Sequence, residues 1–102
     1  MKHISIILAF ILFTASICFG QQYNSQKISK KAITQYNLGL DRAQNGEYNK
    51  ALEFIDNAIK IDNRYLDAYL TKAGIYGEMK DYENCIANYE KAFTIDAEYS
   101  KD

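Results

Sequence analysis

The sequence predicts an all-α fold of tandem antiparallel helix-turn-helix repeats, a short α-solenoid. Three observations lead to this prediction: the 102 residues include no Pro, apolar residues recur at spacings of three and four, and the last third of the chain repeats the pattern of the middle third. Proline interrupts helices, so its absence favours long helical segments. Spacings of three and four place apolar side chains on one face of a helix.

Composition and charge limit the kinds of protein that this chain can be. Apolar residues make up 48% and charged residues 25%, with a formal net charge of −1. This balance is typical of one small folded domain and is too apolar for a disordered segment. We expect no nucleic-acid partner, because affinity for nucleic acid comes largely from positive side chains that neutralise phosphates.

Residues 1–20 have the features of a secretory signal peptide. Lys2 precedes the apolar stretch Ile4–Phe13, and smaller residues follow up to Gly20. A charged start, a short apolar stretch and a small residue before a polar run mark such signals. We therefore expect cleavage after Gly20 and a periplasmic or secreted protein that begins with the segment 21–31.

Two alternatives for this first segment would anchor the chain to a membrane. An uncleaved signal is one, although Thr14 and Ser16 dilute the run of about 20 apolar residues that a spanning helix needs. Lipidation of Cys18 is the other, although such signals usually carry a small residue where Ile17 stands. We expect no membrane insertion of the mature chain.

Cleavage would leave a single cysteine, Cys85, and would remove His3, the only histidine. A framework of disulfides is therefore excluded. We expect Cys85 to be a buried thiol that packs as a small apolar side chain, since free cysteine is among the most buried residue types. An intermolecular disulfide or a reactive thiol is the alternative.

The chain matches itself at a period of about 34 residues, as a duplicated supersecondary unit would. The period divides the chain into repeat 1 at 32–65, repeat 2 at 66–99 and a tail at 100–102. The matched positions include Tyr48 with Tyr82, Ala51 with Cys85, Ala58 with Ala92, Ile61 with Ile95, and Tyr65 with Tyr99.

Each repeat is expected to form two helices that approach each other through small residues, with aromatic rings beside them. The segment 21–31 is a candidate extension of the first helix. The residues expected to hold the repeats together are Leu38, Gly39, Tyr48, Ala51, Ala58, Ala73, Tyr82, Cys85 and Ala92.

The turns inside the two repeats should have the same backbone conformation if the period is real. Gly46 closes the first helix of repeat 1, since glycine tolerates the left-handed backbone at a helix end. Lys80 stands one period later. If the backbone bends the same way at Lys80, we expect that conformation to cost about 1 kcal/mol relative to glycine. The turn between the repeats is expected at 62–64.

These patterns resemble the tetratricopeptide repeat, a helix-turn-helix unit of the same period. The chain departs from the family pattern at Lys72, which replaces Leu, and at Asn63 and Ala97, which replace the usual Pro. The matching residues are Leu38, Gly39, Gly46, Tyr48, Ala51, Ile55 and Ala58 in repeat 1, and Tyr69, Ala73, Tyr76, Tyr82, Tyr89 and Ala92 in repeat 2.

The resemblance implies a module that binds a protein or peptide partner in a concave groove lined by the first helices. Family members that clamp a terminal carboxylate use Lys, Arg and Asn in that groove, and Tyr36 and Leu40 stand here instead. An apolar peptide or helix is the expected occupant, and the N-terminal segment is the alternative. The implied groove residues are Ile33, Tyr36, Leu40, Ala43, Gln44, Asp67, Leu70, Gly74 and Glu78.

Two repeats are few for this architecture, because stacks usually need about three units and polar terminal faces. Three explanations stay open. Tyr89 and Phe93 could pair with a second chain to form a homo-oligomer, the segment Ser25–Lys31 could extend the first helix, or the chain could be a remnant of a longer array.

Catalysis is not expected. The mature chain would have no His, its cysteine has no evident base, and the sequence has no Gly-rich phosphate loop or metal-ligand cluster. Acidic pairs such as Asp81 and Glu83 lie at helix ends, where they serve as caps and solvated charges. We therefore expect no cofactor and no metal.

Overall fold

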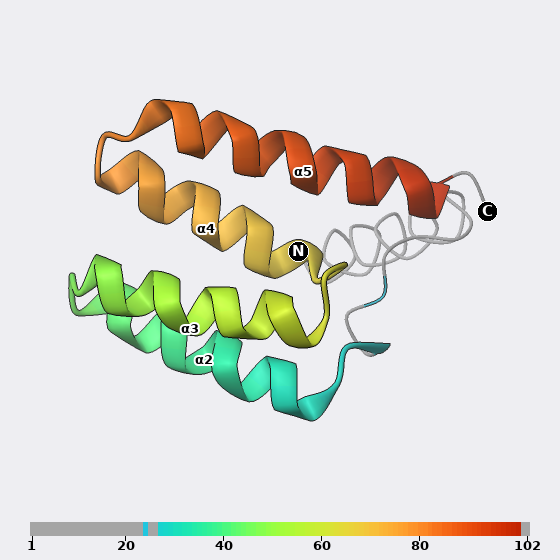
Figure 1. The fold of residues 1–102 in the computed structure, drawn as a ribbon, viewed down its shortest axis with the longest axis horizontal. Helices are drawn as coiled ribbons and strands as arrows, with labels where there is room; N and C mark the ends of the chain where they lie inside the picture. Colours follow the sequence, from blue (N-terminus) through green and yellow to red (C-terminus); the bar gives the residue numbers. More distant parts are fainter. Residues whose placement is uncertain (1–23, 25–26, 101–102) are drawn as a thin grey trace, which may run out of the picture.

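The computed structural model describes residue 24 and residues 27–100, which form four α-helices. The helices are α2 (Lys30–Gln44), α3 (Tyr48–Ile61), α4 (Leu66–Glu78) and α5 (Tyr82–Ser100). Each runs antiparallel to the next, and α5 lies at one edge beside α4 (Figure 1). The described residues contain no strand, so the predicted all-α class is confirmed. The predicted signal at 1–20 lies outside the described residues.

The start of α2 differs from the extension that we expected. Ser29 caps the helix, because its side-chain oxygen accepts a hydrogen bond from the backbone N–H of Ala32 at 3.2 Å. Residues 27–29 are therefore outside the helix, while Lys30 and Lys31 of the segment 21–31 lie within it. Ile28 instead turns inward and is buried in the core cluster against which Ile33 packs. This is the hydrophobic staple, an apolar pair that brackets a helix N-cap.

Gly39 sets the close approach of α2 to α3. A Cβ atom at this position would lie 2.6 Å from Cδ1 of Ile55 and 3.2 Å from the carbonyl oxygen of Ala51. Both neighbours are fully buried in α3. Glycine is required here because any side chain would displace a packed atom.

Most of the small residues expected at helix contacts are buried, while two larger ones are not. Leu38 of α2 is 40% exposed. Tyr82 is 61% exposed at the start of the edge helix α5. Tyr48 and Cys85 are half-buried, so the expectation of a buried thiol is wrong. The buried positions are Gly39, Ala51, Ala58, Ala73 and Ala92.

The two turns inside the hairpins have the same geometry one period apart. Gly46 has φ of 78° and Lys80 has φ of 63°, so the backbone bends the same way at both positions. The residue after each also repeats its hydrogen bond: Glu47 N–H donates to the Arg42 carbonyl and Asp81 N–H to the Tyr76 carbonyl, both at 2.9 Å. Lys80 accepts a strained conformation that glycine adopts without cost.

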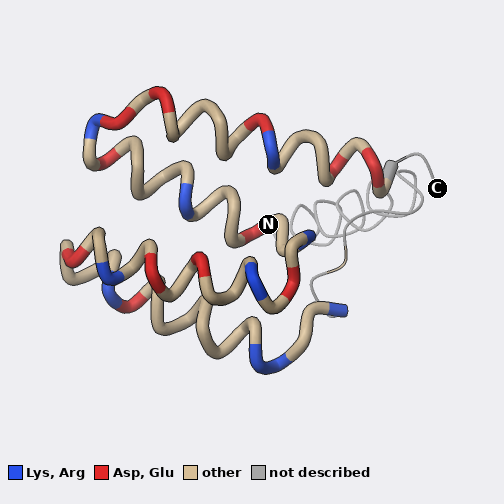
Figure 2. The backbone as a smooth tube through the Cα atoms, viewed as in Figure 1, with Lys and Arg blue, Asp and Glu red and all other residues tan. Residues whose placement is uncertain are grey.

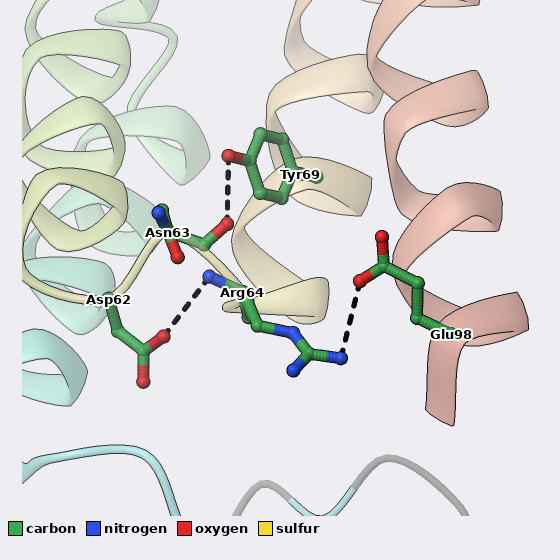
Figure 3. Close-up of polar contacts among 5 residues, drawn as sticks. All are labelled: Asp62, Asn63, Arg64, Tyr69 and Glu98. Carbon is green, nitrogen blue, oxygen red and sulfur yellow. Dashed lines mark hydrogen bonds and ion pairs between the residues drawn. The ribbon is translucent and has the colours of Figure 1, made fainter. Parts of the chain in front are cut away.

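Polar contacts hold the turn between α3 and α4 (Figure 3). The backbone N–H of Arg64 donates to Oδ1 of Asp62 at 3.1 Å, and its guanidinium pairs with Glu98 of α5 at 3.3 Å. The hydroxyl of Tyr69 donates to the carbonyl oxygen of Asn63 at 3.1 Å. These bonds form the turn that we predicted at 62–64, at a place where the family usually carries Pro.

Helix α4 covers the first hairpin. Tyr65, Ala68 and Ile75 join the same buried cluster as Ile55 of α3. At the rim of this contact Lys72 pairs with Asp56 at 2.7 Å, and its side chain is largely covered. The aliphatic stem of Lys72 thus lies over the core and its charge reaches solvent through an ion pair, as lysine side chains commonly do.

Charged residues of both signs are spread along the helices (Figure 2). No helix among the described residues has the length and apolar content needed to cross a membrane. Within the same part of the chain, no group of three or more His, Cys, Asp or Glu residues could hold a metal ion.

Candidate partner-binding groove

An open groove of about 430 Å³ runs between α2, α4 and the start of α3. Its lining is mainly apolar and backbone, with a few polar groups at the edges, which is the usual makeup of a site for another molecule. The lining residues are Leu40, Ala43, Gln44, Tyr48, Thr71, Gly74, Ile75 and Glu78.

The structure brings together part of the predicted groove set. Leu40, Ala43 and Gln44 line the groove from α2, and Gly74 and Glu78 line it from α4. These residues share one face of each helix because they are spaced by three and four. Five of the nine residues implied by the family positions thus line this groove.

Tyr36 lies beside the groove and is held in place. Its hydroxyl shares a hydrogen bond with Oγ1 of Thr71 at 2.8 Å, and Thr71 is a lining residue. Its ring packs against Tyr65, with centroids 5.0 Å apart and planes tilted by 42°. Tyr36 thus ties α2 to α4 at the position where Thr71 enters the groove. Ile33 packs against the buried core cluster, as Tyr36 does, and is not among the lining residues.

Leu70 and Asp67 lie away from the groove. Leu70 lines a second, smaller hollow of about 160 Å³, together with Leu66, Ala92, Phe93 and Asp96. Asp67 is in the first turn of α4, where the helix dipole favours a negative charge. Partial burial raises the pKa of this carboxyl above its ordinary value. Neither residue contributes to the lining that faces α2.

Three lining residues were missed by the sequence analysis: Tyr48, Thr71 and Ile75. The first had been assigned to helix packing, and its half-exposed ring serves the groove as well. Thr71 and Ile75 follow Leu70 and Gly74 directly in the chain, so a shift of the helix face by one residue would have included them. Only the packed structure sets that rotation.

The groove has an acidic edge. Glu78 is exposed at one end, and Gln44 is exposed on the facing helix. At the start of α4, burial raises the pKa of Tyr65 to about 12, and the neighbouring Tyr36, Asp67 and Asp62 add to the rise. Tyr65 therefore stays neutral at physiological pH. The site can supply apolar contact, backbone groups and one carboxylate.

Known proteins share features with this chain. The family model of the tetratricopeptide repeat matches residues 66–99, which comprise α4 and nearly all of α5. The match agrees with the boundaries of repeat 2 drawn from the sequence. The fold is thus an all-α helical repeat of the tetratricopeptide type, and such repeats generally act in protein–protein interactions.

Three curated relatives are similar to the chain. "DnaJ homolog subfamily C member 7" is 31% identical over 86 residues in Homo sapiens and 30% identical over 86 residues in Mus musculus. A "UDP-N-acetylglucosamine--peptide N-acetylglucosaminyltransferase" from Giardia intestinalis is 33% identical over 61 residues.

The relatives are much longer than this chain. The aligned region is 84% of the chain but 17% of either DnaJ homologue. For the transferase the figures are 60% of the chain and 4% of the relative. The similarity therefore concerns a region of these proteins and not their whole activities.

Proposed function

We propose that this chain is an exported adaptor with two tetratricopeptide repeats, which binds a peptide or helix of a partner protein in the groove between α2 and α4. The match of α4 and α5 to the repeat family supports the second repeat. The turns at Gly46 and Lys80, with the same backbone conformation one period apart, support the first.

The observation that carries the proposal is the open backbone at Gly74. A Cβ atom built there would meet no atom within 4 Å, so this part of α4 faces free space inside the groove. Leu40 and Ala43, both partly exposed on α2, provide apolar contact. A partner side chain can therefore approach the helix backbone closely, as in grooves that receive an amphipathic helix.

Charge narrows the class of partner. Glu78 is the one carboxylate among the residues that line the groove, and no Lys, Arg or His lines it. An apolar segment that carries a Lys or Arg would place its charge beside Glu78. A partner's terminal carboxylate would find no positive group there. We therefore expect apolar sequences with a nearby basic residue.

Selection of binders from a random peptide library tests this proposal. Selected peptides should combine apolar residues with Lys or Arg, and Gly74→Leu should lower their affinity by at least about tenfold, since an added side chain fills the groove. Leu40 is the equivalent residue of repeat 1, so leucine fits the helix at this position. Ala87→Leu, on the exposed face of α5, is the matched control.

A separate variant tests the expected contact between Glu78 and a basic residue of the partner. Glu78→Gln should weaken basic peptides and leave uncharged apolar peptides unaffected. If Gly74→Leu and Glu78→Gln both leave affinity unchanged, the groove is not the binding site. Export is tested separately, by N-terminal sequencing of the protein from the extracellular or periplasmic fraction, where Gln21 is the expected first residue.

A catalytic function has less support than peptide binding. The groove lining contains no Cys, His or Ser, and Glu78 has no second carboxylate or base beside it in the lining. An enzyme site needs positioned partners for its acid, base or nucleophile. The Giardia intestinalis transferase shares too small a region to carry its activity over.

A further inference from the structure

The outer side of the second hairpin has an apolar surface that no described helix covers. Phe93 is 71% exposed and Ile86 is 57% exposed. Both lie on α5, the edge helix in Figure 1. We call this surface the end face; its residues are Leu66, Leu70, Ile86, Tyr89 and Phe93.

The end face is equivalent to an interface that the protein already makes. One period earlier, the residues that match Tyr89 and Phe93 are Ile55 and Ile59 of α3. Ile55 is fully buried in the cluster that includes residues of α4, and Ile59 packs against that cluster. A repeat that ends in solvent is expected to be polar at these positions. The second hairpin keeps them apolar, so it retains the surface of a helix-covered repeat.

Helix α2 of another copy is a poor occupant for this surface. In the contact that exists, α4 offers buried residues such as Ala68 and Ile75. One period earlier, α2 has Thr34 and Asp41 at these positions, and both are exposed. Placing Asp41 against Tyr89 would bury a charge without a partner. Head-to-tail stacking of copies is therefore disfavoured.

The end face does complement itself. The hollow of about 160 Å³ is lined by Leu66, Leu70, Ala92, the exposed Asp96 and the protruding Phe93 itself. Apolar cavities of about 150 Å³ accept a benzene molecule. A two-fold axis near the middle of α5 would place each Phe93 in the partner's hollow, as a self-complementary patch requires.

The size of the surface also suits a dimer. Aromatic side chains carry about 150–250 Å² each, so the exposed parts of the end face amount to roughly 400–500 Å² of apolar surface per copy. With a polar rim from both copies, the total passes the roughly 1,000 Å² that a specific interface needs. We propose that two copies of this chain form a closed, isologous dimer through their end faces.

Sedimentation equilibrium of the protein under reducing conditions, which exclude a Cys85 disulfide, tests the dimer. A monomer–dimer equilibrium should fit the data, with no larger species as concentration rises. Phe93→Glu should raise the dimer dissociation constant by at least about a hundredfold, because both copies carry the change at the centre. Its helix content should persist, because Phe93 is mostly exposed.

Ala87→Glu is the matched control. It adds the same charge to an exposed position of α5, one period after the exposed Glu53, so the dimer should persist. A wild-type monomer at every concentration, whatever else covers Phe93, would overturn the proposal. So would growth into larger oligomers, or a dimer that Phe93→Glu does not weaken. Peptide binding by the groove does not affect these readouts, so the two proposals fail separately.

Discussion

The two hairpins carry the same pattern but differ in what covers them. In the first, Ile55 of α3 is fully buried, because α4 packs over the hairpin. In the second, Tyr89 of α5 is one period later and is exposed. Ala58 and Ala92, which face inside their own hairpins, are buried in both. Contacts within a hairpin are thus set by its own sequence, whereas burial of the next layer depends on the neighbour.

Truncation of the equivalent core positions should show the largest difference. Ile55→Ala should cost about 2–5 kcal/mol of unfolding free energy, since it leaves a cavity between packed helices. Tyr89→Ala should cost about 0.5 kcal/mol, as substitutions at exposed positions usually do. Urea denaturation in the Phe93→Glu background, which removes any dimer, measures both. Equal losses would mean that α5 is covered as fully as α3.

Substitution of two glycines by alanine, one in each hairpin, should change stability in opposite directions. Gly39→Ala should destabilise by about 1–3 kcal/mol, because its Cβ would overlap Ile55 and no space is free. Gly74→Ala should stabilise by about 0.5–1 kcal/mol, because it meets no atom and lowers the entropy cost of the helix. Denaturant midpoints decide the signs. A stabilising Gly39→Ala would contradict the close contact of α2 and α3.

Substitutions in the equivalent turns at Gly46 and Lys80 should change stability by smaller amounts. Lys80→Gly should stabilise by about 1 kcal/mol, since it relieves a left-handed backbone on a residue with a Cβ. Gly46→Lys should destabilise by a similar amount. For a domain of this size, about 1 kcal/mol moves the melting temperature by about 4–8 °C. Unchanged melting in both variants would contradict the equivalence of the turns.

The pH dependence of stability should change in one alkaline window. The pKa of Tyr65 is raised from 10.0 to about 12, chiefly by burial, so the folded protein holds this proton more tightly than the unfolded chain. The contribution is present below pH 10 and is lost as the pH rises towards 12. Tyr65→Phe should flatten the unfolding free energy across that window. An identical decline in both proteins would show that Tyr65 ionises normally.

Much of the fold could be predicted from local pattern. The Gly39 contact and the Gly46 turn follow from residue type and period, whereas the left-handed backbone at Lys80 is shown by the structure. Ile28 was missed because it precedes the helix and joins the core only once Ser29 has capped α2. The hollow beside Leu70 could not be predicted either, because it exists only where a covering helix is absent from the described part of the chain.

Some groove residues could likewise be predicted from the repeat pattern, while others depend on how the helices pack. Leu40, Gly74 and Glu78 were assigned by their positions in the repeat, and they line it. Thr71 enters the lining because its hydroxyl bonds to Tyr36 across the two hairpins. A bond between residues on different repeats depends on how the helices rotate, which periodicity does not specify.

Native-state hydrogen exchange tests the contrast between the hairpins most directly. In the monomeric Phe93→Glu variant, amides in the middle of α3 should exchange only through global unfolding, whereas those of α5 should exchange through a lower-energy local opening. In the wild-type protein, raising the concentration should slow exchange in α5 and leave α3 unchanged. Equal protection of α3 and α5 in the variant would contradict the claim that the second hairpin lacks its cover.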